Sequence, residues 1–284
     1  MKLALVISII LILNSPCLPQ NFNYKRSFGE FKNATSFYIN AAGVVFVTDD
    51  ITDEVYQLDT LGNMFLTIGG YGWDIDAFDD PVDIFADALK VLVTDRNNNR
   101  IQRFDKNLNF IFEFKTEDKD IDVERFQYPL SAVTSNLGDV FILDSDNTRI
   151  LKFDPFGNYI QDIGGYNYGS FTLSNPKQLA ISMQNNIYVI DGINIFIFDN
   201  YGTVLGLIEA EEQLRSIRII FNWLTTNTKE KIYFSNLKSS EEKLMEAKLN
   251  GFEDKLDIVS SLIFNKKLYV LSPTTIHIFS PLQQ

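Results

Sequence analysis

The chain has 284 residues, enough for one large domain or two smaller ones and for a sizeable buried core. Its formal net charge of -12 argues against a general nucleic-acid or anionic-membrane binder, because such proteins draw their affinity from clustered Lys and Arg. With 24 Phe, 12 Tyr and many short β-branched or aromatic runs that end on a polar residue, the composition favours an all-β protein.

The N-terminal segment has the features of a secretory signal. Residues 3–13 form an apolar run behind a lysine, about half of the ~20 residues that span a bilayer. We therefore predict that residues 1–20 are a cleaved signal peptide. Cys17, the one cysteine, lies in this segment, and residues 14–16 match a lipobox poorly, which predicts ordinary cleavage rather than lipidation. The mature chain would then lack disulfides. We expect an exported protein that is periplasmic, extracellular or in the cell envelope.

A repeat follows in chain order. An Asp closes a short apolar run four times, at Asp49, Asp95, Asp144 and Asp191, with steps of 46, 49 and 47 residues. A second Asp and a turn such as TLGN or PFGN follow each one, and three copies place a Pro before the next strand, where a missing N–H does least harm. Each unit indicates four strands in ~45 residues, which is typical of a β-propeller blade.

The recurring residue types have a physical reason. Each blade must turn tightly between strands, so carboxylates and amides accept backbone N–H groups and Gly supplies positive φ. One blade cannot bury both of its faces alone, so the blades must stack in a ring.

The second half of the chain repeats less clearly, and the sequence leaves open whether residues 203–257 form a regular blade. EKLMEAKLNG (242–251) aligns without a gap with DEVYQLDTLG (53–62), and Ser235 and Ser272 take the place of Asp191. Residues 239–249 have helical propensity and a capping-box pattern, but the repeat predicts a strand there.

The two ends of the chain complement each other. The last unit stops at Gln284 without an outer strand, while NYKRSFGEF (23–31) matches the outer strands at 63–71 and 158–166. We predict that the N-terminal strand pairs with the C-terminal blade and removes the exposed edges. The predicted fold is all-β, a six-bladed β-propeller formed by one domain, residues 21–284.

The motifs VTDRNNNRIQRFD (93–105) and ILDSDNTRILKFDPFGN (142–158), each preceded by the Pro, resemble NHL repeats. The likeness is good over residues 22–202 and weak beyond. NHL propellers recur in bacterial exported proteins and in animal regulators, so the resemblance implies a fold more than an activity. RNA binding by the animal members is opposed here by the charge and the export signal.

The sequence offers few catalytic residues. The one histidine, His277, lies on a predicted strand, and we assign it to packing or solvent. The D-x-D-x-T run at 144–148 begins like a calcium loop, but Arg149 and Pro155 replace the required Gly and Glu. We predict no catalytic residue, no metal ligand and no cofactor, although 37 Asp and Glu keep calcium possible. The alternative is a calcium-dependent, lactonase-like hydrolase or a lyase with ligands at the central channel.

The connections between blades, residues 69–81, 116–129 and 164–176, combine aromatic and acidic side chains and should converge around one mouth of the channel. Aromatic residues in a polar rim are typical of recognition surfaces. The candidate binding residues are Tyr71, Trp73, Asp74, Asp76, Tyr166, Tyr168 and Phe171. The alternative is that the aromatic rings only wedge neighbouring blades together.

We therefore predict a non-enzymatic recognition scaffold that binds a protein, peptide or glycan through these loops, with a basic partner favoured. We expect no nucleic-acid partner, no membrane span, and a monomer or a component of an envelope complex.

Overall fold

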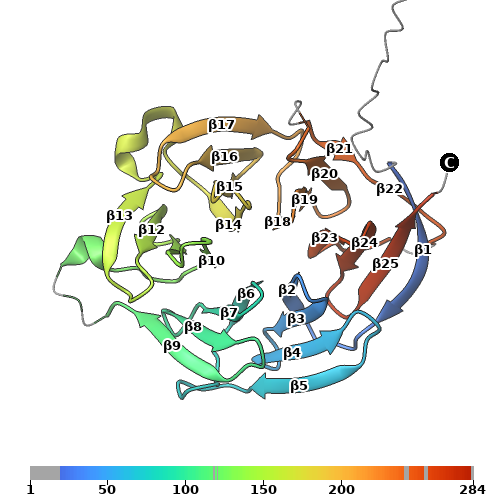
Figure 1. Ribbon diagram of the computed structural model, residues 1–284, viewed down its shortest axis with the longest axis horizontal. Helices are drawn as coiled ribbons and strands as arrows, with labels where there is room; N and C mark the ends of the chain where they lie inside the picture. Colours follow the sequence, from blue (N-terminus) through green and yellow to red (C-terminus); the bar gives the residue numbers. More distant parts are fainter. Residues whose placement is uncertain (1–19, 118, 120, 240–242, 253–254, 283–284) are drawn as a thin grey trace, which may run out of the picture.

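The computed structural model describes residues 20–117, 119, 121–239, 243–252 and 255–282. Six small sheets form a ring (Figure 1), which confirms the predicted six-bladed β-propeller. Most of the predicted signal peptide, Cys17 included, lies outside the described residues. Within the described residues, no helix is long and apolar enough to cross a membrane.

The first four blades follow one another along the chain, each with its inner strand first. Blade 1 comprises β2 (Ala34–Ile39), β3 (Val44–Asp49), β4 (Glu54–Asp59) and β5 (Met64–Gly69), and blade 2 comprises β6 (Pro81–Ala86), β7 (Lys90–Asp95), β8 (Arg100–Asp105) and β9 (Phe110–Lys115). Blade 3 comprises β10 (Ser131–Thr134), β11 (Val140–Asp144), β12 (Arg149–Phe153) and β13 (Tyr159–Ile163), and blade 4 comprises β14 (Pro176–Ile181), β15 (Ile187–Asp191), β16 (Asn194–Phe198) and β17 (Val204–Glu209). Two short 3-10 helices, η1 (Asp122–Glu124) and η2 (Tyr166–Phe171), interrupt the connections into blades 3 and 4.

One segment of the chain supplies an outer strand to each of the last two blades. Blade 5 comprises β18 (Ser216–Ile220), β19 (Trp223–Asn227), β20 (Ile232–Asn236) and the short β21 (Met245–Glu246), and blade 6 comprises β23 (Ser260–Phe264), β24 (Lys267–Leu271), β25 (Ile276–Pro281), β1 (Asn21–Phe28) and β22 (Lys248–Asn250). After β21 the chain leaves blade 5, and β22 pairs in parallel with β1 of blade 6.

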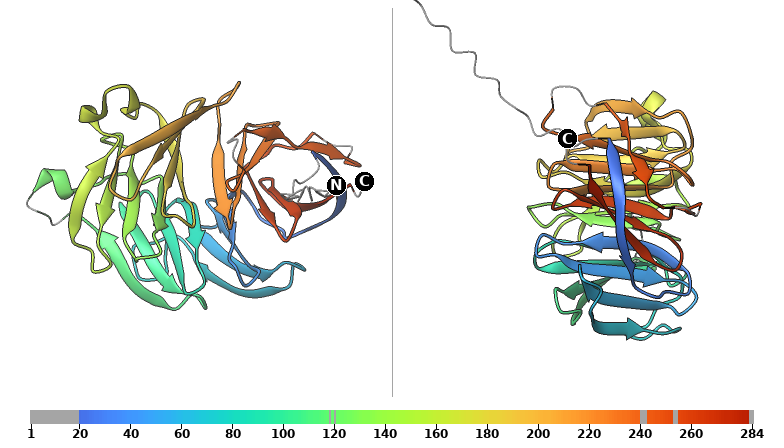
Figure 2. Two further views of the ribbon diagram at one scale, coloured as in Figure 1. Left: turned by 45° about the horizontal axis from the view of Figure 1, so that its top comes forward. Right: turned by 90° about the vertical axis from the view of Figure 1, so that its right-hand side faces the viewer.

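The ring closes where the N-terminal strand meets the last blade. β1 pairs antiparallel with β25, from Phe22 opposite Pro281 to Phe28 opposite Ile276, and it runs beside the C-terminal strands in Figure 2. Phe22 is fully buried and packs edge-on against Phe234 of blade 5, with ring centroids 5.8 Å apart. The predicted closure is confirmed, and the buried ring of Phe22 anchors it.

The repeated Asp fixes the connection that enters its own blade. Asp49 accepts hydrogen bonds from the backbone N–H groups of Lys32 (2.6 Å) and Asn33 (2.9 Å), immediately before β2. Equivalent bonds join Asp95 to Asp79, Asp144 to Gln127, and Asp191 to Ser174 and Asn175. In each of the first four blades, the carboxylate therefore ties the entering loop to the end of the second strand.

Blade 5 corrects one part of the sequence alignment. Ser235 lies in β20, the third strand, so Asn227 at the end of β19 takes the place of Asp191. The gap-free alignment of 242–251 with a third strand was wrong, because β21 and β22 within this segment are outer strands. The cause is the two-residue turn at residues 221–222, which joins β18 to β19. Because this turn is short, the later strands of blade 5 begin earlier in the sequence than the repeat predicts.

The propeller has two faces, which we name by what they carry. The entry face carries the connections into each blade and the turns between second and third strands. The turn face carries the turns between first and second strands and between third and fourth strands. The buried apolar side chains form three clusters within the ring of blades.

Candidate functional site

The centre of the channel holds a ring of polar residues. Each inner strand contributes a buried polar side chain to this ring: Ser36, Asp83, Ser131, Gln178, Ser216 and Ser260. Several of these side chains also accept the backbone N–H of the following blade, as Ser36 does from Ile84 (3.1 Å) and Gln178 from Ile217 (2.7 Å). The ring therefore links neighbouring inner strands to one another.

Asp83 is the hub of this ring. Its carboxylate accepts hydrogen bonds from the Ser36 hydroxyl (2.9 Å), the Ser131 hydroxyl, the Gln178 amide (2.8 Å) and the Arg218 guanidinium (2.7 Å). These partners come from blades 1, 3, 4 and 5. Blade 6 joins through the contact of Ser260 with Ser216, at 2.6 Å between the hydroxyl oxygens.

An internal cation, the Arg218 guanidinium, lies against the Asp83 carboxylate in the channel. The side chains of Asp83 and Arg218 are both 2% exposed, and Arg218 also donates to the Phe37 carbonyl at 3.0 Å. Four donors, one of them a cation, already surround this carboxylate, so a metal ion there would have to displace the Arg218 guanidinium. Among the described residues no group of three or more His, Cys, Asp or Glu is placed to hold a metal ion. The channel residues do not fit a calcium site.

The strongest candidate surface lies on the entry face, in the connection between β5 and β6. We call residues 71–80, YGWDIDAFDD, the aromatic-acidic loop. Arg100 of β8, itself paired with Asp95 at 2.8 Å, donates to the carbonyls of Trp73 (2.9 Å), Asp74 (3.0 Å) and Ala77 (2.9 Å). Because the buried guanidinium holds these carbonyls inward, the loop backbone is fixed.

Two aromatic side chains of this loop are presented to solvent. Tyr71 and Trp73 are 66% and 67% exposed, and their rings meet edge to face with centroids 5.4 Å apart. Asp74 beside them is also exposed. Asp76 is half-buried: burial raises the pKa of its carboxyl, and one of its oxygens has no hydrogen-bond partner among the described residues. The loop thus combines exposed apolar area with carboxylates.

Further carboxylates crowd the same boundary between blades 1 and 2. Burial raises the pKa of Asp53, and the charges of Asp79 and Asp50 raise it further, although the backbone N–H of Asp80 opposes them. Burial likewise raises the pKa of Asp80, where Arg96 opposes the rise and Asp50 and Asp79 add to it. Like charges held this close produce a negative potential beside the exposed rings.

The remaining predicted residues lie in another loop. Tyr166 is 95% exposed at the start of η2, but Tyr168 and Phe171 are half-buried against Phe198 (5.8 Å between ring centroids) and Phe196 (5.5 Å) of β16. The last two therefore wedge the loop onto blade 4. Figure 1 places η2 at the outside of the ring, with blades 2 and 3 between it and the aromatic-acidic loop. The structure brings Tyr71, Trp73 and Asp74 together and keeps Tyr166 apart.

His277 lies in β25 and is buried. Its Nε2 is 3.2 Å from the Ser272 hydroxyl, and its ring meets that of Phe252 at 4.8 Å between centroids. Burial lowers the pKa of the imidazole. These contacts agree with the assignment of His277 to packing.

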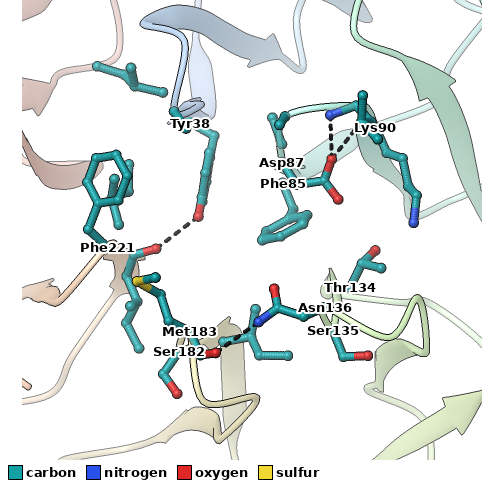
Figure 3. Close-up of a pocket in the computed structure, with 18 residues that line it drawn as sticks. Tyr38, Phe85, Asp87, Lys90, Thr134, Ser135, Asn136, Ser182, Met183 and Phe221 are labelled. Atoms are coloured by element: carbon teal, nitrogen blue, oxygen red, sulfur yellow. Dashed lines mark hydrogen bonds between the residues drawn. The ribbon is translucent and has the colours of Figure 1, made fainter.

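The turn face holds a feature that the sequence reasoning missed. A cavity of about 430 Å³ opens at the mouth of the channel and is lined by the first turns of blades 1 to 5 (Figure 3). The available signal was the presence of large apolar residues at turn tips, where polar residues are usual. The residues are Leu89, Leu137, Met183 and Phe221.

Comparisons with known proteins support the fold. No family model matches the chain. A curated relative, Protein brain tumor of Drosophila melanogaster, is 28% identical over 142 residues, which are 48% of this chain and 13% of the fly protein. The chain thus spans about an eighth of the length of that relative.

Solved structures match over nearly the whole chain. A streptogramin B lyase has a TM-score of 0.64 at 12% identity and covers 90% of this chain and 97% of its own. Virginiamycin B lyase from Staphylococcus aureus has a TM-score of 0.63 at 12% identity, with 90% and 99% covered. A gluconolactonase from Xanthomonas campestris has a TM-score of 0.65 at 11% identity, with 94% and 96% covered. At such identities the likeness establishes the propeller fold alone.

Proposed function

We propose that the protein is a non-enzymatic recognition scaffold that binds a basic segment of a partner protein through the aromatic-acidic loop. One observation carries the proposal: Tyr71 and Trp73 are exposed on a backbone that Arg100 holds in place, next to a group of carboxylates. Tyr and Trp are the side chains that most often dominate binding energy at interfaces.

The mechanism is presentation of a preformed surface. Because the loop carbonyls are already bonded to Arg100, binding does not have to order the backbone, and that lowers the entropic cost of association. Lys or Arg side chains of the partner would lie over the Tyr71 and Trp73 rings in cation–π contacts and pair with the nearby carboxylates. The negative potential would chiefly accelerate encounter.

The channel supports this choice over an enzyme. The solved lyases and the gluconolactonase share the fold at 11–12% identity, which carries no activity to this chain. The Asp83 carboxylate is saturated by Arg218 and by neutral donors from three other blades. A hydrolase or lyase that relies on free carboxylates in the channel therefore has no counterpart among these residues.

The finer classification is part of the same proposal. We assign the blades to the NHL type, supported by the strand-end aspartates that bond the entering loops and by the partial match to Protein brain tumor. We also propose that the protein is exported, supported by the signal-like pattern of residues 1–20.

Peptide selection on the purified protein tests the proposed surface. A random 12-residue peptide library panned on the wild type should yield peptides enriched in Lys and Arg. Trp73→Ala should weaken the selected peptides about 30-fold, which corresponds to a hot spot of ~2 kcal/mol. Phe156→Ala is the matched control, because Phe156 is also a strongly exposed aromatic residue but lies on the turn face. Selection of acidic peptides, or equal loss in both variants, would refute the proposal.

A further inference from the structure

The cavity on the turn face is a second, independent candidate site. Its floor is formed by Tyr38 of β2 and Phe85 of β6, whose rings are 5.1 Å apart between centroids and inclined by 57° (Figure 3). Its volume of about 430 Å³ lies in the range of small-molecule sites, which are mostly apolar with a few oriented polar groups. The cavity therefore has the size and the lining of a ligand pocket.

Turn tips with apolar side chains form the rim of the cavity, although exposed turns usually carry polar residues. The tips of the first turns in blades 2, 4 and 5 carry Leu89, Met183 and Phe221, with exposures from 43% to 69%. The equivalent turn of blade 6 has the usual polar pair, Asn265 and Lys266. Exposed apolar residues gathered around one opening indicate a surface that is covered in use.

Phe221 also adopts an unfavourable backbone conformation. Its φ of +55° lies in the left-handed region, at the first position of a two-residue hairpin turn that favours Gly. A bulky residue there costs of order 1–2 kcal/mol relative to Gly. Its ring stacks on Phe264 at 6.4 Å between centroids, which offsets part of that cost and aims the side chain along the rim. Strain of this kind is common at binding sites.

The polar groups at the cavity favour a ligand that donates hydrogen bonds. The Asp87 carboxylate accepts the N–H groups of Leu89 (2.7 Å) and Lys90 (2.8 Å) through Oδ1, and Oδ2 accepts none from the described residues. Asn136 donates its amide to the Met183 carbonyl at 2.8 Å, which turns its carbonyl oxygen toward the cavity (Figure 3). The Thr134 hydroxyl is buried in the lining and has no partner in the described part of the chain.

The charge balance also favours a cation. Lys90 does not neutralise Asp87, because its ammonium points away from that carboxylate and lies beside Gly138 of blade 3 (Figure 3). Burial raises the pKa of Tyr38 well above its ordinary value, Arg218 opposes the rise, and the charge of Asp87 adds to it. Arg218 itself is paired with Asp83 deeper in the channel. Asp87 and Lys90 both line the cavity without an ion-pair partner among the described residues, and they lie apart, so the Asp87 carboxylate stays available to a cation.

We propose that the turn-face cavity binds a small organic cation, an amine with an aromatic or branched apolar body. The apolar body lies between the ring pair Tyr38 and Phe85 and the apolar rim, and the ammonium donates to Asp87 Oδ2 and the Asn136 carbonyl oxygen. The rings add cation–π attraction when the ammonium lies over their faces. This site does not depend on the aromatic-acidic loop, which lies on the other face.

Three small molecules with the same aromatic body test the proposal: phenethylamine, 2-phenylethanol and phenylacetate. Each is titrated into the purified protein by saturation-transfer NMR. Phenethylamine should bind with a dissociation constant of about 1 mM or lower. It should bind at least about tenfold tighter than phenylacetate, because Asp87 attracts the ammonium of phenethylamine and repels the carboxylate of phenylacetate.

Two variants locate the binding. Asp87→Asn keeps the Oδ1 acceptor that caps its turn and should reduce the preference for the cation to about threefold or less. Ala41→Trp, at an exposed position on the rim, should weaken all three compounds. Trp73→Ala, on the entry face, should change none of them. Equal binding of the three compounds, absence of phenethylamine binding, or an unchanged preference in Asp87→Asn would overturn the proposal.

Discussion

Asp83→Asn removes the negative charge at the hub of the channel without changing the side-chain volume. The wild-type carboxylate accepts four hydrogen bonds, one of them from the equally buried Arg218. Loss of one partner leaves the other charge buried and unpaired, which costs about 3–5 kcal/mol. An amide also cannot accept at both of its heavy atoms, so one hydroxyl or amide donor loses its acceptor at a further cost of about 1–3 kcal/mol. The expected loss is therefore a large fraction of the total stability of 5–15 kcal/mol that is typical of folded proteins.

The assay is urea unfolding followed by circular dichroism, with Asp83→Asn, Arg218→Met and the double variant compared with the wild type. The double variant removes both charges, so it should be more stable than the sum of the two single losses predicts, by at least about 1 kcal/mol. If Asp83→Asn unfolds within about 1 kcal/mol of the wild type, or if the two losses are additive, the ion pair is not the hub of the channel.

Three further predictions concern closure, pH and loop order. Phe22→Ala should destabilise the protein by about 3–5 kcal/mol, because it empties a fully buried position at the junction of the two chain ends; thermal unfolding measures the loss. Burial lowers the pKa of His277, so the folded protein favours the neutral imidazole. The free energy of unfolding is therefore full above the unfolded pKa of about 6.5 and falls as the pH drops through that value toward the lower folded pKa. In urea unfolding between pH 7.5 and 5, His277→Phe should flatten this dependence. Arg100→Lys should leave the fold intact but increase amide hydrogen exchange in the aromatic-acidic loop and weaken peptide binding, since an ammonium cannot reproduce the forked contacts to three carbonyls.

The blades were predictable wherever their fixing residues are themselves repeated. Asp95 and Asp144 each bond the loop that enters their own blade, and that function requires the same residue at the same place in every copy. The strands of blade 5 were misaligned because an amide, Asn227, replaces the carboxylate and donates to carbonyls of the next connection instead of accepting N–H groups. When the equivalent residue changes its hydrogen-bonding role, only the strand pairing seen in the structure identifies it.

The candidate site was less predictable, because exposure depends on distant partners. Trp73 and Phe171 occupy similar connections, yet Arg100 turns the first outward and the ring of Phe196 covers the second. No local pattern separates the two cases. The polar ring of the channel did leave a signal, because every inner strand carries at least one buried polar residue such as Ser36 or Gln178. Its meaning, however, depends on the six strands meeting at one axis.

The channel network also decides how the two faces relate to each other. Asp83 and Arg218, with Ser36, Ser131 and Gln178, join side chains of five blades into one hydrogen-bonded network in the channel. Coupling between the faces would need a two-state element that both ligands bias, and a saturated network in close-packed sheets offers no second arrangement of comparable energy. We therefore expect that a basic partner on the entry face and an amine on the turn face would bind independently.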